Sequence, residues 1–378
     1  MTETEIKINR GLKGVYFERS GVSRIDGSAG ELEYRGYSIH DLATQSTFEE
    51  TAYLLIYGEL PTAAQLADFD VALKASYTLP DPIFDIIRAT QGAHPMQVMR
   101  TAVSALEGFA DDAEDRSPEG MIAQTIHLTA QVPMIAAAHD RIRNGKDPVP
   151  ADPSLTFAAN WLWMLKGEKP TDDTARLADI DFILHAEHGS NASAFTARVV
   201  VGTEATVHAA VTAAIAALSG PAHGGAAEDV MKMAVEIGSA DKAAEYVKSK
   251  RKAKEPVTGF GHRVYRAEDP RARHMRAGVE KLSKEMGEPQ WFEILQAVVE
   301  AMSPYARHGV NVNVDFYSGV IYHLHGIPTD LFVPIFAIGR VPGWGVQCIE
   351  QQDSNILIRP LTLYNGPETR AYVPISER

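Results

Sequence analysis

The apolar positions of this chain change their spacing once, near residue 36. Before that point, three short apolar runs are separated by turn pairs of the Ser-Gly and Asp-Gly type: Val15-Tyr16-Phe17, Val22–Ile25 and Leu32–Tyr34. Such runs between turn residues predict small strands. After Gly36 the apolar positions recur three and four residues apart almost to the end of the chain, which predicts helices.

Polar capping residues mark the expected helix starts. The chain shows two capping boxes and two capping residues before a proline: Ser46–Glu49, Thr62–Gln65, Asp81-Pro82 and Ser117-Pro118. Pro133 should kink a long helix from about 118 to 143. We count roughly fifteen helices and no alternation of strands and helices, so the predicted fold class is mainly α.

No segment predicts a membrane span or an export signal. The longest apolar runs, Ala209–Leu218 and Leu331–Gly339, have about half of the ~20 residues that a bilayer-spanning helix needs. Met1–Arg10 is polar and carries two glutamates, unlike a signal peptide or a transit peptide. We therefore expect a cytoplasmic protein without a membrane partner.

Composition places the chain among globular proteins. It has 378 residues, 45% of them hydrophobic and 22% charged, which suits two domains or one large core with an inserted lobe. The net charge of −13, from 36 basic and 49 acidic residues, argues against a protein that binds nucleic acid or anionic membranes. Cys348 is the single cysteine, so an internal disulfide and a zinc site built on thiolates are excluded.

Two histidines stand close together after a helical stretch. Zinc protease motifs place their histidines four residues apart, whereas His185 and His188 are three apart, which disfavours a metal site. We expect one of the two to be a packed core residue with a hydrogen bond. The other should face a polar ligand.

Two further histidines lie in segments rich in glycine. His223 precedes a helix that begins near Gly225, where the positive helix end disfavours the imidazolium form. A neutral histidine there can donate a hydrogen bond to a substrate carbonyl, and the alternative is a histidine in an ordinary loop. His262 follows Gly259-Phe260-Gly261, a tight turn in which backbone N–H groups can approach a ligand.

Charged residues beyond these turns suit anionic ligands. A local concentration of arginines fits either a solvated basic helix end or a pocket for phosphates and carboxylates: Arg263, Arg266, Arg271 and Arg273. Asp315 precedes a helical stretch and is either an N-cap or a carboxylate base in a partly desolvated site. Arg340 and Arg359 follow apolar residues, and each either pairs with a helix carboxyl end or is aimed at a buried anion.

Taken together, the motifs resemble those of the citrate synthase family. Three occur in the order and spacing of that family: Gly220-Pro-Ala-His223-Gly-Gly-Ala, Gly259-Phe-Gly-His262-Arg-Val-Tyr and Asn313-Val-Asp315-Phe-Tyr-Ser-Gly319. Arg-Gly-Tyr at 35–37, Ala-His-Pro-Met at 93–96 and Ile-Arg-Pro at 358–360 also match. The resemblance covers essentially the whole chain and is strongest to the short dimeric type of bacteria and archaea.

The resemblance implies a nearly all-α homodimer with a few short N-terminal strands. A large domain would comprise residues 1–222 and 323–378, and a small inserted domain, 223–322, would close over the site. His223, His262 and Asp315 match the catalytic trio. The oxaloacetate set matches His188, Arg271, Arg340, the aromatic Phe336 and Arg359 of the partner subunit. The coenzyme A contacts match Val257, Thr258, Gly259, Phe260, Gly261 and Arg266.

The implied reaction joins acetyl-CoA to oxaloacetate and hydrolyses citryl-CoA to citrate and CoA. Asp315 would remove a methyl proton, neutral His223 would donate to the thioester oxygen, and His262 would donate to the ketone oxygen. The dianionic acceptor explains several arginines, because bidentate pairs orient as well as attract. The resemblance implies no metal and no cofactor besides the coenzyme A thioester.

Other functions fit the same motifs. A 2-methylcitrate synthase would use propionyl-CoA, and one methylene in an apolar pocket discriminates by only about 1–3 kcal/mol. A citryl-CoA-cleaving lyase and a catalytically silent helical protein that keeps a CoA pocket are further alternatives. Ser190, Ala227 and Val312 depart from the family pattern, although none of them removes a catalytic group.

Overall fold

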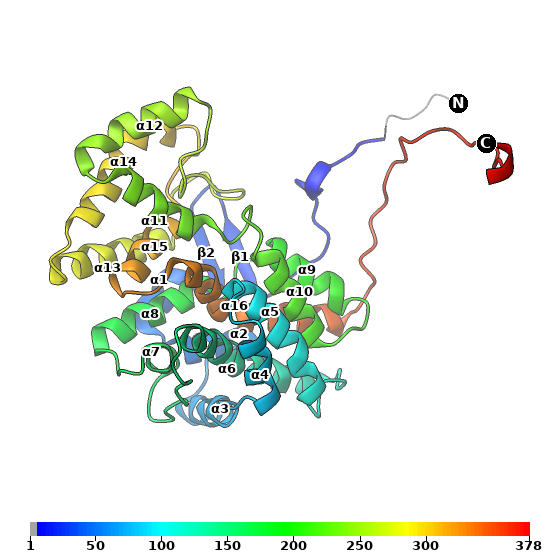
Figure 1. Ribbon diagram of the computed structural model, residues 1–378, viewed down its shortest axis with the longest axis horizontal. Helices are drawn as coiled ribbons and strands as arrows, with labels where there is room; N and C mark the ends of the chain where they lie inside the picture. The colour runs from blue at the N-terminus through cyan, green and yellow to red at the C-terminus, as the bar shows by residue number, and fades with distance from the viewer. Residues whose placement is uncertain (1–5) are drawn as a thin grey trace.

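The computed structural model describes residues 6–378, and these residues form sixteen α-helices and three short strands (Figure 1). The predicted mainly α class is therefore confirmed. The helices are α1 (Ile39–Gln45), α2 (Phe48–Tyr57), α3 (Ala63–Ala75), α4 (Asp81–Ala89), α5 (Pro95–Leu106), α6 (Pro118–Arg143), α7 (Phe157–Lys166), α8 (Asp172–His185), α9 (Ala192–Val201), α10 (Val207–Leu218), α11 (Ala226–Ile237), α12 (Ala243–Lys252), α13 (Ala272–Glu285), α14 (Gln290–Ala306), α15 (Asp315–Leu324) and α16 (Phe332–Asp353).

The strands near the N-terminus form one antiparallel sheet in the order β1, β2, β3. Their bounds are β1 (Ser23–Asp26), β2 (Glu31–Tyr34) and β3 (Tyr37–Ser38). Ser23 pairs with Tyr34 and Asp26 with Glu31, so β1 and β2 make a hairpin whose turn covers residues 27–30. The strands predicted around residues 22–25 and 32–34 are confirmed within one residue.

The segment Val15-Tyr16-Phe17, which was predicted as a strand, is irregular, so that prediction is wrong. A strand needs a neighbouring strand to satisfy its backbone hydrogen bonds, and the sheet of the described residues offers none here. The segment runs over α9 instead. Phe17 meets Phe195 edge-on, with ring centroids 5.0 Å apart, and the guanidinium of Arg198 lies 5.5 Å from the Phe17 ring centroid.

The capping signals predict two helix starts correctly and miss two others by one residue. Thr62 and Ser117 cap α3 and α6 through their hydroxyl groups. Thr47, not Ser46, caps α2. Either hydroxyl could serve as a cap, so the sequence alone does not decide between these two adjacent positions. Asp81 is the first residue of α4 rather than its cap. These are errors of register within correctly predicted helices.

Two long helices, α6 and α16, lie against each other in the centre of the fold (Figure 1). Helix α6 covers the predicted range and contains Pro133. Helix α16 also packs against α8, α9 and α10, and Trp344 at its middle is fully buried. Because α16 contacts the helices on either side of the His188 segment, it can align side chains from both.

By length and composition, the stretch Thr329–Asp353 could cross a membrane, and it is the one such stretch among residues 6–378. It extends well beyond the apolar run Leu331–Gly339 noted in the sequence. However, 89% of its most apolar window is buried inside the fold, which is typical of a core helix. The cytoplasmic location stays a prediction, and residues 1–5 of the N-terminal segment on which it partly rests lie outside the described residues.

Helices α11 to α15 gather on one side of the molecule, and the other helices, including α16, lie on the opposite side (Figure 1). A single cluster of buried apolar side chains runs through both groups. The inserted domain at 223–322 stays a prediction, and α15 continues past its boundary to Leu324. The described residues before β1 and the residues after α16 leave the helical body on the same side as two arms (Figure 1).

Candidate active site

The segment that carries His188 joins α8 to α9 and is held from several sides. His185, at the end of α8, is a buried core residue whose Nδ1 lies 2.9 Å from the carbonyl oxygen of Asp181. His188 lies 3.1 Å through Nε2 from the hydroxyl of Tyr265, and burial, followed by Arg271, lowers its pKa well below the usual range. The expectation that one of the two histidines is a hydrogen-bonded core residue is confirmed for His185.

His223 lies in the turn before α11, as predicted, and its ring is held by Ser193. The Ser193 N–H donates to Nε2 over 3.3 Å, and the Ser193 hydroxyl lies 2.9 Å from the same nitrogen. This favours the neutral tautomer with its proton on Nδ1, the nitrogen that can donate to a ligand. Burial, followed by the charge of Arg340, lowers the pKa of His223 to about 4, so burial rather than the helix end keeps the ring neutral.

His262 follows a tight turn, and its ring has the opposite tautomer. Gly259 and Gly261 adopt the left-handed conformation, with φ of 81° and 87°. The N–H groups of Val264 and Tyr265 both donate to His262 Nδ1 over 3.1 Å, which leaves the proton on Nε2. Burial, followed by Arg271, lowers the pKa of His262 to about 4. His223 and His262 are therefore neutral and can donate through different nitrogens.

His262 and His188 lie close together although they come from distant parts of the sequence. Their ring centroids are 5.2 Å apart, with the rings nearly perpendicular. Tyr265 contacts both, with its ring centroid 4.8 Å from that of His262 and 5.4 Å from that of His188. Sequence reasoning missed Tyr265, although it belongs to the Gly-His-Arg-Val-Tyr motif.

Asp315 is the first residue of α15, and Val314 occupies the N-cap position. The N-cap alternative for Asp315 is therefore wrong, and the Asn313 side-chain oxygen accepts the backbone N–H of Asp315 over 3.2 Å. Burial raises the pKa of the Asp315 carboxyl, and the nearby His185 and Arg271 partly oppose this. A carboxylate with a raised pKa is a stronger base than an ordinary one.

Arg340 is a buried cation, and only part of its guanidinium group is hydrogen-bonded. Its side chain is 1% exposed, and its Nε donates to the carbonyl of His185. Its Nη1 and Nη2 find no hydrogen-bond partner among the described residues. Phe336 lies one turn earlier on α16, with its ring centroid 4.8 Å from the Arg340 guanidinium, 4.7 Å from the His185 ring and 6.3 Å from the His223 ring. The unpartnered nitrogens indicate a site for an anion.

Arg271 is also buried, and Asp269 holds it in place. Asp269 accepts from Nε over 2.9 Å and from Nη2 over 2.7 Å. Burial alone would lower the pKa of Arg271, but the Asp269 carboxylate outweighs this effect and raises it. Both groups therefore stay ionised. Sequence reasoning missed Asp269, and its position two residues before Arg271 was the available signal.

The predicted coenzyme A loop runs beside the residues that lead to Asp315. Gly261 N–H donates to the Asn311 carbonyl over 2.7 Å, and Asn313 N–H donates to the Gly259 carbonyl over 3.0 Å. A Cβ on Gly259 would lie 2.5 Å from the Phe316 ring, so only glycine permits this approach. Val257 is buried, Thr258 and Phe260 are half-buried, and Arg266 is exposed. The structure thus brings the loop against the helix that begins with Asp315.

Arg359 lies apart from the other predicted site residues. It is exposed and belongs to the extended arm that follows α16. That arm leads away from the helical body (Figure 1). Within one chain, the structure therefore gathers His188, His223, His262, Arg271, Asp315, Phe336 and Arg340, but not Arg359.

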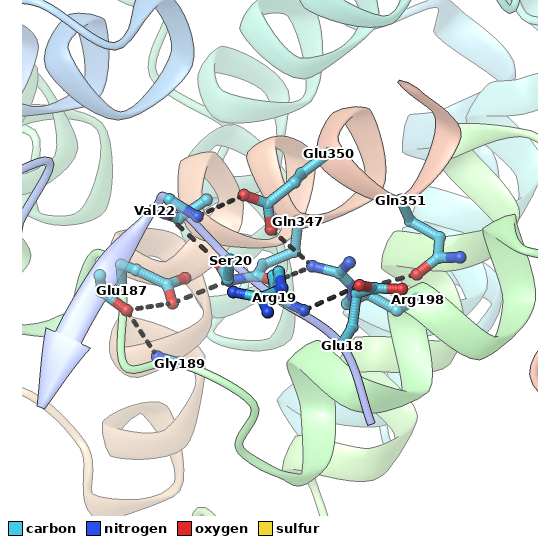
Figure 2. Close-up of polar contacts among 12 residues, drawn as sticks. Glu18, Arg19, Ser20, Val22, Glu187, Gly189, Arg198, Gln347, Glu350 and Gln351 are labelled. Atoms are coloured by element: carbon cyan, nitrogen blue, oxygen red, sulfur yellow. Dashed lines mark hydrogen bonds and ion pairs between the residues drawn. The ribbon is translucent and has the colours of Figure 1, made fainter. Parts of the chain in front are cut away.

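A polar network supports the His188 segment from behind (Figure 2). Arg198 of α9 is buried and donates to Gln347 over 2.8 Å and to Gln351 over 3.0 Å. Gln347 in turn donates to the buried Glu187 carboxylate over 3.0 Å. Burial, opposed by Arg340, raises the pKa of Glu187 to about 7. Gln347 and Arg340 lie two turns apart on α16, so that helix contacts the His188 segment at two points.

The comparisons with known proteins agree with this geometry. Residues 11–361 match the family model described as citrate synthase, C-terminal domain. The chain belongs to the citrate synthase family. A citrate synthase of Deinococcus radiodurans is 43% identical over 98% of this chain and 99% of its own length. The solved ternary complex of a Thermoplasma acidophilum citrate synthase with carboxymethyl coenzyme A and oxaloacetate has a TM-score of 0.93 at 30% identity, covering 98% of this chain and 100% of that one.

Membership in the citrate synthase family confirms the predicted fold and the predicted enzyme class. A 2-methylcitrate synthase of Corynebacterium glutamicum is 41% identical over 99% of both chains, so the family also contains the predicted alternative. The relatives named citrate synthase include the more similar proteins, which favours citrate synthase activity.

Proposed function

We propose that the chain condenses acetyl-CoA with oxaloacetate and hydrolyses the resulting citryl-CoA to citrate and CoA. The observation that carries this proposal is Arg340, a buried guanidinium with two unpartnered nitrogens beside neutral His223 and the Phe336 ring. A buried cation of this kind is stabilised by an anionic partner. A dicarboxylate supplies such a partner.

In the proposed complex, oxaloacetate lies between Arg340, Arg271 and His188. Arg340 would hold one carboxylate through its two free nitrogens, and Phe336 stacked on the guanidinium would fix its plane. Arg271, oriented by Asp269, would bind the second charged group. His188 is neutral and would act as a hydrogen-bonding partner rather than as a cation.

The first chemical step is removal of a proton from the acetyl methyl group. The Asp315 carboxylate takes the proton, the C–H electron pair moves into the new carbon–carbon double bond, and charge develops on the thioester oxygen. His223 would donate its Nδ1–H to that oxygen, as the Ser193 contacts at Nε2 favour. General base and hydrogen-bond donor each contribute about 10²–10⁴-fold to such reactions.

The second step forms the new carbon–carbon bond. The enol carbon attacks the ketone carbon of oxaloacetate, and the ketone oxygen gains charge and takes up a proton. His262 would donate its Nε2–H there, because Nδ1 is occupied by two backbone N–H groups. Water then attacks the thioester carbonyl of citryl-CoA, the C–S bond breaks, and CoA leaves as the thiol.

Coenzyme A would bind along the loop of Val257, Thr258, Gly259, Phe260 and Gly261, with Arg266 near its phosphates. The loop is held by backbone hydrogen bonds to residues 311 and 313, so its own N–H groups have fixed directions. Arg266 is exposed, as a contact to a large soluble cofactor group requires. The two proton transfers at the acetyl group and the ketone are assigned to side chains of the protein, and the proposal involves no cofactor besides the coenzyme A thioester.

We also propose that the protein is a homodimer whose sites combine residues of two subunits. The arms carry large apolar side chains in solvent, among them Tyr16, Leu361 and Tyr372, which are 98%, 86% and 81% exposed. Exposed apolar residues in such numbers mark an interaction surface. The C-terminal arm would bring Arg359 to the neighbouring site, and residues 223–322 would move as the small domain that closes each site.

The test is release of the CoA thiol, measured with acetyl-CoA and with propionyl-CoA in the presence of oxaloacetate. We expect the ratio of kcat/KM to favour acetyl-CoA. A ratio in favour of propionyl-CoA would show that the chain is a 2-methylcitrate synthase. A folded protein that releases no thiol from either thioester would contradict the proposed function altogether.

A further inference from the structure

The open end of the β1–β2 hairpin contacts the segment that carries His188. The Ser23 hydroxyl donates to the Glu187 carboxylate over 3.2 Å and accepts the N–H of Gly189 over 3.1 Å. Tyr34, the sheet partner of Ser23, donates its hydroxyl proton to the Glu187 carbonyl over 2.9 Å and accepts the Glu187 N–H over 3.2 Å. Glu187 and Gly189, which flank His188, are therefore both held by the first residue pair of the hairpin, Ser23 with Tyr34.

The turn of the same hairpin contacts the loop that follows His262. The Gly27 carbonyl accepts the N–H of Arg266 over 2.7 Å. The fit leaves no space for a side chain: a Cβ on Gly27 would lie 2.3 Å from the carbonyl oxygen of Val264. A Cβ on Gly30 would lie 2.9 Å from the carbonyl oxygen of Glu268. The turn thus meets the backbone of this loop directly.

The two ends of the hairpin stand at a fixed separation. Four consecutive residue pairs, from Ser23 with Tyr34 to Asp26 with Glu31, join β1 and β2. At about 3.3 Å per residue, this ladder separates its first and last pairs by roughly 10 Å. We propose that the hairpin sets the position that the His262 loop takes relative to the His188 segment when the site is closed, with Ser23 and Gly27 as positioning residues.

The inference explains how two loops from distant parts of the chain bring their histidine rings to 5.2 Å from each other. It rests on the proposed function, which assigns both histidines to the oxaloacetate site. If the turn were displaced, the hydrogen bond from the Arg266 N–H to the Gly27 carbonyl would be lost. Among the described residues, this is the only backbone hydrogen bond between the hairpin and the His262 loop. His262 would then approach the ketone oxygen from a changed direction.

Two variants displace the turn by different means. Gly27→Ala adds a methyl group against the Val264 carbonyl. A shortened turn, in which Asn-Gly replaces residues 27–30, removes the contact without a clash and keeps β1 paired with β2, because Asn-Gly suits a two-residue hairpin. Gly92→Ala is the matched control, since Gly92 is exposed and nothing lies within 4 Å of the added Cβ.

We expect both turn variants to lose about 10–100-fold in kcat, because a displacement near 1 Å can cost about 10²-fold. The Tm of the shortened-turn variant should stay close to that of Gly92→Ala. Ser23→Ala should raise the KM for oxaloacetate more than that for acetyl-CoA, and Ser23→Thr should restore it by returning the hydroxyl. A shortened-turn variant with wild-type kcat and KM would overturn the inference. Absence of thiol release by the wild-type protein would instead contradict the proposed function.

Discussion

The side-chain oxygen of Asn313 accepts the backbone N–H of Asp315 over 3.2 Å, and Asp315 is the first residue of α15 rather than its N-cap. An aspartate at a helix start usually satisfies the exposed N–H groups of the first turn itself. Because Asp315 stands after the N-cap position, its carboxylate is not needed as a cap, and the nearby His185 and Arg271 act on its charge. Burial raises its pKa, which strengthens it as a base.

Asp315→Asn should therefore lose most turnover while oxaloacetate binding is kept. The amide has the same shape but cannot accept the methyl proton, so kcat should fall by about 10²–10⁴-fold. Thiol release gives kcat, and calorimetric titration gives oxaloacetate affinity. Asp81→Asn is the control, because Asp81 is also the first residue of a helix but is exposed. Near-wild-type kcat in Asp315→Asn would exclude Asp315 as the base.

Arg340→Lys should weaken oxaloacetate binding in spite of the retained charge. Lysine cannot donate to the His185 carbonyl and hold a carboxylate in a fork at the same time. Loss of one hydrogen bond to a charged group costs about 1.5–3 kcal/mol, so the KM for oxaloacetate should rise far more than that for acetyl-CoA. The exposed Arg88→Lys is the matched control. Equal changes in both KM values would argue against a direct contact.

Stability should fall as the pH is lowered from about 6.5 to 4. The pKa of His208, His223 and His262 is lowered to about 4 by burial, whereas an unfolded histidine titrates near 6.5. In this window the unfolded chain binds more protons, and each such histidine contributes a slope of up to about 1.4 kcal/mol per pH unit. Above pH 6.5 these groups should contribute no slope.

His208 allows this to be checked away from the site, because it lies buried on α10. His208→Gln should flatten the decline of unfolding free energy between pH 6.5 and 4, measured by urea denaturation. His308→Gln, at an exposed position, should leave the slope unchanged. The same slope in all three proteins would show that buried histidines do not control the acid response.

The sequence was sufficient to select the candidate site residues that stand in motifs. His223, His262 and Asp315 each stand close to a glycine or an asparagine in a turn that only a few residue types can form. The reactive side chain and the turn residues therefore indicate the same position in the chain. The positions of His223 and Asp315 next to helix starts could be derived in the same way. The family resemblance then connected them across about 90 residues of chain, which periodicity alone could not do.

The supporting residues could not be predicted, because their contacts join parts of the chain that are far apart. Ser193 orients His223, Asp269 holds Arg271, and Gln347 supports Glu187. Each is an ordinary polar residue whose role depends on what tertiary packing places next to it. The failed strand at Val15–Phe17 has the same origin, since whether an apolar run becomes a strand depends on a partner elsewhere.

Oxaloacetate should make the protein more compact. Arg271 belongs to the predicted small domain, whereas His188 and Arg340 belong to the predicted large one. A dianion that bridges both binds the closed arrangement more tightly and shifts the population toward it. Small-angle scattering should show a smaller radius of gyration with saturating oxaloacetate, and no change in Arg271→Ala. An unchanged radius in the wild-type protein at proven saturation would contradict closure.

The position of Arg359 on an exposed arm makes the composite site testable. If Arg359 reaches the neighbouring site and faces a substrate carboxylate, its removal should cost about 2–5 kcal/mol of transition-state binding. Arg359→Ala homodimers should then be nearly inactive, as should His262→Ala homodimers. Heterodimers of the two variants, made by co-expression and purified with two different tags, separate the possible arrangements.

If Arg359 acts across the interface, one site of the heterodimer carries both defects and the other carries neither. Activity should therefore recover to about half of the wild-type value per dimer, because an intact site needs no help from the damaged one. If Arg359 served its own subunit, each site would keep one defect and no activity would return. A heterodimer of Arg359→Ala with wild-type protein is the control for assembly and should have about half activity in either case. Purified mixed heterodimers that stay inactive while this control is active would show that Arg359 does not cross the interface.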